Sequence, residues 1–224
     1  EVPSESLETK EGRIRIKGSA DPGMEYQEVA KLASHASGGA PLLGVGAFSV
    51  PSSVVIPDAS RYGNISMAYS FGVQVAEVQV DRKTGKVTIL QFFSVHDSGT
   101  VINPMLGEGQ VEGGVVQGIG YALMEEIVRE AGKVLNGNFT DYRIPTIKDV
   151  PPIKTIFIEE PDPFGPYGAK GLGEITQVPT APAVANAIYD AIGIRLKELP
   201  MTPERVFKAL KGSPRTKIEN RGGR

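Results

Sequence analysis

Cysteine is absent from the 224-residue chain, which excludes disulfides, thiolate catalysis, iron–sulfur ligation and cysteine-based zinc sites within it. Its two histidines, His35 and His96, are too few for a histidine-based metal site without carboxylates. No apolar run is long enough to span a membrane, and no apolar segment after a charged start indicates a signal peptide. The lack of cysteine fits a cytoplasmic protein, and we expect that location.

The net charge is −2, and the chain lacks the clustered lysines and arginines of a nucleic-acid surface. We therefore expect no nucleic-acid partner. The only basic run is at the C-terminus, where we interpret residues 211–224 as a flexible, solvated tail. An apolar content of 40% allows a sizeable core, so disorder is not expected. Because the first residue is Glu1 and not Met, we expect a processed piece, a fragment or a subunit without its start.

Hydrophobic periodicity predicts a mixture of strands and helices. A β-hairpin is expected at residues 70–95, because two apolar runs flank a polar turn in which Gly85 supplies a positive φ. A shift in the apolar phase near Val75 and Ala76 predicts a bulge in its first strand. Thr202 is expected to cap a final helix that ends before Gly212. The other predicted elements are strands at 11–18 and 153–159, helices at 24–34, 108–130 and 183–192 (closed by Gly193), and a long irregular connection at 36–61.

The predicted helix at residues 108–130 contains an unusual set of glycines: Gly113, Gly114, Gly118 and Gly120. Each glycine in a helix interior costs about 1 kcal/mol relative to alanine. Such a cost predicts close packing of the helix backbone against another element or a ligand.

A second glycine-rich segment ends in a carboxylate, in the run from Gly168 through Lys170, Gly171 and Gly173 to Glu174. Glycines let the backbone approach a ligand because no Cβ intervenes. A carboxylate on such a loop serves as a general base if its surroundings tune its pKa. The alternative is a surface turn with a solvated acid, and the loop alone leaves both readings open.

Two shorter patterns are rejected as functional motifs. Residues 107–113 resemble a dinucleotide fingerprint, but the third glycine is displaced by one position and no strand feeds directly into them. The run His96-Asp97-Ser98 contains the residue types of a catalytic triad, but adjacent residues rarely reach the geometry that a triad requires.

Five ordered stretches resemble the molybdenum-binding subunit of the xanthine dehydrogenase and aldehyde oxidase family: residues 95–104, 108–118, 141–145, 165–174 and 199–205. The resemblance implies an α+β fold, with residues 1–210 forming the C-terminal part of the molybdopterin-binding region. It also implies an oxidoreductase that hydroxylates a carbon centre of an aldehyde, a purine or an N-heterocycle, with water as the oxygen source. The implied cofactor is molybdenum held by molybdopterin, possibly as the cytosine dinucleotide.

The resemblance also assigns roles to individual residues. Glu174 matches the general base of the family, and Gln110 matches a glutamine that contacts the pterin. Gly171 and Gly173 would let the loop backbone approach the cofactor, and Lys170 would neutralise anionic charge there. No residue of this chain is expected to bind the metal directly. The plainer readings are that Gln110 caps the glycine-rich helix and that Lys170 is a surface lysine.

The chain has no counterpart of the family's N-terminal motifs and no cysteine for iron–sulfur clusters. We therefore expect an enzyme subunit that is incomplete without a partner chain carrying the N-terminal half of the molybdenum subunit. Iron–sulfur and FAD-binding flavin subunits are the other partners implied for this hetero-oligomer, besides a small-molecule substrate. The alternatives are a non-catalytic structural or assembly subunit, or a related carbon monoxide dehydrogenase or aromatic thioester reductase.

Overall fold

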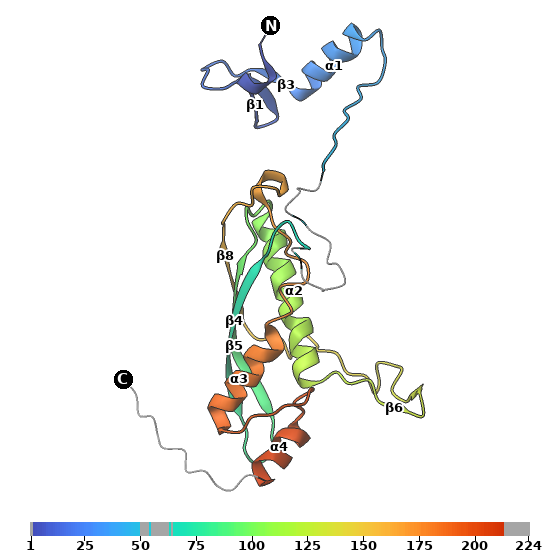
Figure 1. Cartoon of the computed structure of the whole chain (residues 1–224), viewed down its shortest axis with the longest axis vertical. Coiled ribbons are helices and arrows are strands. Elements are labelled where there is room, and N and C mark those ends of the chain that lie inside the picture. Colours follow the sequence, from blue (N-terminus) through green and yellow to red (C-terminus); the bar gives the residue numbers. More distant parts are fainter. Residues whose placement is uncertain (1, 50–53, 55–62, 64, 213–224) are drawn as a thin grey trace, which may run out of the picture. The chain divides into compact units, whose positions relative to one another are not determined.

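The computed structural model describes residues 2–49, 54, 63 and 65–212. It divides into two compact units, Glu1–Pro51 and Ser52–Arg224, which are described separately (Figure 1). In the described part of the chain, no helix is both long enough and apolar enough to cross a membrane.

The first unit is a small antiparallel sheet followed by a helix. The sheet has the order β1 (Leu7–Lys10), β2 (Arg13–Ile16) and β3 (Met24–Glu25), and a 3-10 turn, η1 (Ser4–Ser6), precedes it. Helix α1 (Tyr26–Ala36) follows β3 directly. The predicted strand and helix of this unit are thus confirmed with shifted ends. None of the described residues of this unit is fully buried.

The connection predicted at residues 36–61 is described only in part. Residues 37–49 contain no helix or strand, in agreement with the prediction. Most of its remainder lies outside the described residues, as do residues 213–224 of the predicted tail.

The second unit is built on a three-stranded sheet with the order β4-β5-β8 (Figure 1). Strands β4 (Phe71–Val80) and β5 (Val87–Asp97) form the predicted hairpin, and β8 (Ile153–Ile158) pairs parallel to β5. Gly85 has a φ of 78° and donates its N–H to the Asp81 carbonyl at 2.7 Å, which closes the turn. The predicted bulge is displaced: the register shifts between Glu77 and Val78, beyond the position predicted.

Two helices cover one face of this sheet, α2 (Pro104–Leu123) and α3 (Thr180–Ile192) (Figure 1). The inward side chains of the strands meet them in a core made of Phe92, Val111, Val115, Ile119, Ala122, Ala181, Val184, Ile188, Ile192, Met201 and Val206. Helix α3 starts earlier than predicted and ends as predicted at Gly193, which has a φ of 73°.

The glycines of α2 explain how closely these two helices pack. A Cβ atom on Gly114 would lie 2.0 Å from Oγ1 of Thr176, and one on Gly118 would lie 2.4 Å from Cβ of Thr180. Both distances are too short for any side chain, so only glycine permits this approach. The predicted close packing against another element is therefore confirmed for this face of α2. Gly113, in contrast, faces open space.

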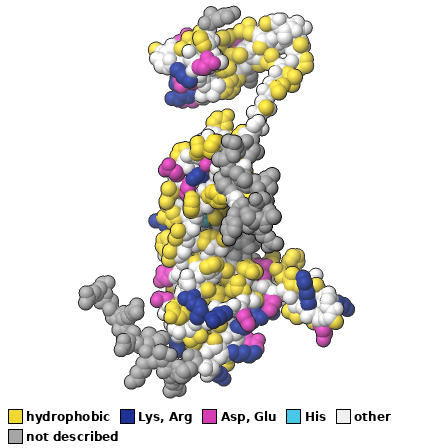
Figure 2. All heavy atoms as spheres, in the orientation of Figure 1, with side chains coloured by type: hydrophobic (Ala, Val, Ile, Leu, Met, Phe, Trp, Pro, Cys, Tyr) yellow, Lys and Arg dark blue, Asp and Glu magenta, His cyan; other side chains and the backbone are white. Residues whose placement is uncertain are grey.

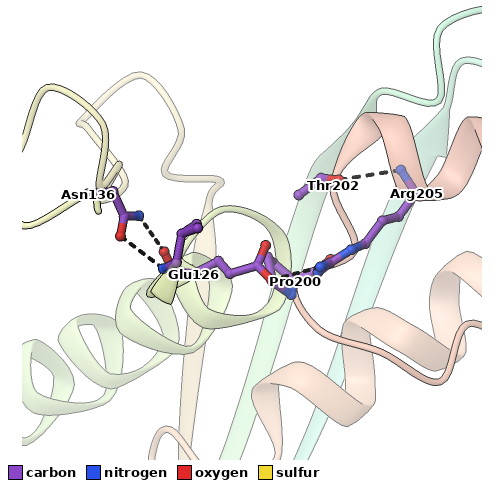
Figure 3. A network of polar contacts seen from close by, with 6 residues as sticks. Glu126, Asn136, Pro200, Thr202 and Arg205 are labelled. Atoms are coloured by element: carbon purple, nitrogen blue, oxygen red, sulfur yellow. Dashed lines mark hydrogen bonds and ion pairs between the residues drawn. The ribbon is translucent and has the colours of Figure 1, made fainter. Parts of the chain in front are cut away.

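Helix α2 begins and ends earlier than the predicted 108–130. Asn103 caps its start by accepting the Leu106 N–H at 3.1 Å. Beyond its end, the Asn136 side chain bonds the Glu126 carbonyl at 2.6 Å and the Val128 N–H at 2.9 Å (Figure 3). These bonds hold residues 126–128 outside the helix, next to a hairpin of β6 (Arg129–Glu130) and β7 (Lys133–Val134).

The C-terminal motif at residues 199–205 anchors the last helix, α4 (Pro203–Gly212). Thr202 caps it as predicted, since its Oγ1 accepts the Arg205 N–H at 3.3 Å, although Gly212 is the last residue of the helix and not the first beyond it. The Arg205 guanidinium donates to the Pro200 carbonyl at 2.9 Å and to Glu126 at 2.7 Å (Figure 3). This motif therefore joins α4 to the segment that follows α2.

Candidate active site on the glycine-rich loop

The loop between β8 and α3 carries most of the predicted site residues, and its first half is fixed to the end of β5. It passes through a 3-10 turn, η2 (Pro166–Gly168). The Gly168 carbonyl accepts the Thr100 N–H at 2.9 Å, and the Lys170 N–H donates to the Ser98 carbonyl at 2.8 Å. These backbone bonds make the loop a local extension of the sheet, so its position is determined by the strand.

Lys170 is bound to Asp97, with 2.7 Å between its Nζ and Oδ2, and their side chains are only 9% and 14% exposed. Burial alone would raise the pKa of the Asp97 carboxyl. Hydrogen bonds from the Lys170 ammonium and the Gly99 N–H outweigh burial and hold this pKa below its usual value. The contact that the structure shows for Lys170 is therefore this buried ion pair, while its predicted contact with a cofactor stays a prediction.

The structure brings Gln110 to the second half of the loop. Gln110 Nε2 donates to the Gly173 carbonyl at 2.8 Å, and the Thr176 hydroxyl donates to the same carbonyl at 3.2 Å. The Ser70 hydroxyl bonds the Gly171 carbonyl at 2.7 Å. Gln110 lies in the middle of α2, so it does not cap that helix. The structure thus brings Gln110 of α2 into contact with the loop segment that contains Gly171 and Gly173.

Glu174 follows this fixed segment and is exposed. Its backbone carbonyl accepts the Gln177 N–H at 3.1 Å. Within the described part of the chain, its carboxylate takes part in no hydrogen bond or ion pair. Glu174 therefore combines a determined backbone position with a carboxylate that is available to accept a proton.

A buried polar network that no sequence motif indicates lies under the loop. Gln74 on β4 contacts Ser94 on β5 at 2.9 Å, the Thr176 carbonyl at 2.7 Å and the Thr180 hydroxyl at 2.7 Å. All of these residues are buried. The available signal was a polar residue at an inward position of β4, between Val73 and Val75, where periodicity predicts an apolar one.

His96 forms the far end of this network and is fully buried. Its Nε2 contacts the Ser94 hydroxyl at 2.7 Å, while its Nδ1 has no hydrogen-bond partner in the described structure. Nδ1 packs against Gly72, where a Cβ atom would lie 2.7 Å away. Burial lowers the pKa of His96, because the charged imidazolium would lose its water without gaining a partner of opposite charge. His96 is therefore a neutral core residue.

The surface around Gln110 fits a flat polar ring system such as a pterin. Four glycines leave the backbone bare there, with no atom within 4 Å of where a Cβ would stand: Gly109, Gly113, Gly171 and Gly173. Gln110 uses one N–H on Gly173, which leaves its second N–H and its carbonyl oxygen for a ligand. Among the described residues, no group of three or more His, Asp or Glu side chains is arranged to hold a metal ion.

A cavity of about 660 Å³ lies elsewhere, at the C-terminal end of α2, between Leu123, Arg143 and Met201. None of the predicted site residues lines it. Glu174 and Gln110 are instead exposed. They are candidates because they combine a carboxylate without a partner among the described residues, an amide with unused hydrogen-bonding groups and bare backbone.

Comparison with known proteins identifies the family. The model of the molybdopterin cofactor-binding domain family matches residues 1–151. A xanthine dehydrogenase molybdenum-binding subunit of Escherichia coli O157:H7 is 43% identical over 141 residues, covering 62% of this chain and 19% of that protein. The 6-hydroxypseudooxynicotine dehydrogenase complex subunit gamma of Paenarthrobacter nicotinovorans is 40% identical over 155 residues, covering 67% and 20%. The crystal structure of quinoline 2-oxidoreductase from Pseudomonas putida 86 matches with a TM-score of 0.74 and 32% identity, covering 95% of this chain and 26% of that one.

The chain therefore belongs to the molybdopterin cofactor-binding domain family. The predicted family and the predicted α+β fold are both confirmed. The chain spans about a fifth to a quarter of the length of these relatives (19%, 20% and 26%). Glu174 lies beyond the residues that the family model matches.

Proposed function

We propose that this chain is part of a molybdenum hydroxylase subunit and that Glu174 is its general base. The observation that carries the proposal is the free carboxylate of Glu174, next to a backbone segment held by Gln110 and Thr176. A general base needs a determined position and an unoccupied lone pair. The backbone next to Glu174 is held, its carboxylate is unoccupied within the described part of the chain, and it adjoins the bare backbone that suits the family's cofactor.

Each site residue has a proposed role toward the cofactor. The free N–H and carbonyl of Gln110 would pair with polar edges of the pterin, and Gly171 and Gly173 would let the loop lie against it. Lys170, through its ion pair with Asp97, would hold the loop against the end of β5. When bound, the molybdenum–pterin group supplies oxygen transfer to carbon and takes up the electrons.

Glu174 contributes the proton chemistry in this scheme. Its carboxylate accepts the proton that the oxygen nucleophile loses as it attacks the substrate carbon. Removing that proton during the attack raises the nucleophilicity of the oxygen, and positioned general bases typically contribute about 10²- to 10⁴-fold to rate. We propose an aldehyde, a purine or another N-heterocycle as substrate, with water as the source of oxygen.

The outer face of the β4-β5-β8 sheet, which no described helix of the second unit covers, carries exposed apolar side chains that support a partner chain. Its cross-strand rows are Phe71, Asp97 and Ile158, then Val73, Val95 and Ile156, then Val75, Phe93 and Lys154. Their apolar members on the two outer strands are exposed, from 41% for Ile156 to 68% for Phe71. Figure 2 shows hydrophobic side chains along the side of the second unit on which Figure 1 labels β8.

A sheet with exposed apolar side chains on its second face as well is typical of one covered on both sides. Helices α2 and α3 cover one face, so we propose that the other is covered by the N-terminal part of the molybdenum subunit. We propose that this part also reaches the helix-covered side of the sheet, where it would complete the cofactor pocket at Gln110 and Glu174. Iron–sulfur and flavin subunits would then receive the electrons.

The test is Glu174→Gln in the assembled, molybdenum-loaded enzyme. This change keeps the shape and removes the proton acceptor, so we expect kcat to fall by roughly 10²- to 10⁴-fold with the molybdenum content unchanged. Glu160→Gln is the matched control, because Glu160 is an exposed carboxylate before the same loop and should leave kcat unaffected. Retained turnover in Glu174→Gln would favour the alternative, a structural or assembly subunit without chemistry of its own.

A further inference from the structure

The buried side chain of Gln74 uses its amide hydrogens and its oxygen in hydrogen bonds. Its Nε2 donates to Ser94 Oγ at 2.9 Å and to the Thr176 carbonyl at 2.7 Å. Its Oε1 accepts from the Thr180 hydroxyl at 2.7 Å. The side chain thereby links β4, β5 and the segment that leads into α3.

The partners of Gln74 determine which way its amide points. The Thr176 carbonyl only accepts hydrogen bonds, so the amide nitrogen must face it. A flipped amide would place two oxygens against each other and would leave the Thr176 carbonyl without a donor. Gln74 is therefore held in a single orientation by chemistry.

The hydrogen bond from Gln74 to the Thr176 carbonyl is connected to the backbone next to Glu174. Thr176 is two residues after Glu174, and its hydroxyl donates to the Gly173 carbonyl just before Glu174. Gln110 holds that same carbonyl from the exposed side. The turn that presents Glu174 is thus held from outside by Gln110 and from inside by Gln74.

We infer that Gln74 is a positioning residue, whose amide fixes the Thr176 peptide and so aims the Glu174 carboxylate. The inference rests on the proposed role of Glu174 and adds a residue that no motif of this chain includes. A catalytic group must be held within a fraction of an ångström, because a misplacement of about 1 Å costs on the order of 10²-fold in rate. A buried amide gives such a hold, since an unpaired buried carbonyl has no water to replace the lost bond.

The experiment is Gln74→Met in the assembled, molybdenum-loaded enzyme. Methionine has a similar length and volume but removes all three hydrogen bonds. We expect kcat per bound molybdenum to fall by roughly 10- to 100-fold, while KM and molybdenum content stay the same. Gln79→Met is the matched control, because Gln79 lies on the same strand with an exposed side chain. It should leave kcat unchanged.

Hydrogen exchange of the loop separates positioning from general stability. Gln74→Met should raise amide exchange at residues 173–177 and leave the central strand β5 protected. Thr180→Val is the second variant if Gln74→Met fails to assemble, because it removes only the hydroxyl that Gln74 Oε1 accepts from. It should lower kcat per molybdenum by a smaller factor and loosen the same residues.

Combination with Glu174→Gln distinguishes this inference from the proposed function. If Gln74 acts through Glu174, the double variant is no slower than Glu174→Gln alone. Unchanged kcat and unchanged loop exchange in Gln74→Met or Thr180→Val would overturn the inference, as would a full additional loss in the double variant. Turnover retained by Glu174→Gln would reject the proposed function itself.

Discussion

Replacement of Gly118 by alanine tests the packing that places α2 beside the candidate site. The added Cβ would lie 2.4 Å from Thr180 Cβ, 2.7 Å from Oγ1 and 2.8 Å from Cγ2. Because Thr180 Cβ is attached directly to the α3 backbone, no flexible side-chain end can move aside. The two helices must therefore separate locally.

The expected cost follows from two opposing effects. Overpacking of a tight core typically costs about 1–3 kcal/mol. Alanine is favoured over glycine in a helix interior by about 1 kcal/mol, which offsets part of that cost. We expect Gly118→Ala to lower the free energy of unfolding by up to about 2 kcal/mol.

Gly113→Ala on the same helix is the matched control. Its Cβ would have no atom within 4 Å, so only the helix preference acts and we expect a gain of up to about 1 kcal/mol. Equilibrium urea unfolding followed by far-ultraviolet circular dichroism measures both variants. A Gly118→Ala protein as stable as the Gly113→Ala protein would refute the proposed closeness of α2 and α3.

Two further predictions concern charged and titratable groups. Because burial lowers the pKa of His96, the unfolded state, with a pKa of about 6.5, takes up a proton before the folded state. His96 therefore contributes stability above about pH 6.5 that is lost as the pH falls towards its folded pKa; urea unfolding between about pH 5 and 8 should show this component, and His96→Gln should remove it. Lys170→Met leaves the Asp97 carboxylate buried and unpaired, and should cost about 3 kcal/mol in the same assay. Combining it with Asp97→Asn should restore much of that loss, and no recovery would contradict the assigned pairing.

The elements that could be predicted from the sequence are those with local causes. The β4–β5 hairpin depends on alternation along each strand and on a positive φ at Gly85, both of which are properties of short segments. The end of α2 has a distant cause. Its continuation past Leu123 is prevented by bonds from Asn136 to Glu126 and Val128, so local helix preference gave the wrong boundary.

The same distinction applies to the candidate site. Gln110 and the loop up to Glu174 were recognisable because the family resemblance lies in contiguous stretches. The hydrogen bonds of Gln74 join it to Thr176 and Thr180, more than a hundred residues away in the sequence. Periodicity identifies an inward polar residue on a strand but does not name its partners, so this network required the fold.

The distance between the Glu174 carboxylate and the reacting centre is the most direct test of the account. An experimental structure of the assembled subunit with its molybdenum–pterin group would measure it. We predict that this carboxylate faces the cofactor in a closed pocket, within hydrogen-bond reach of the reacting atoms, roughly 2.6–3.2 Å. A Glu174 side chain in open solvent, far from the pterin, would contradict the proposed role.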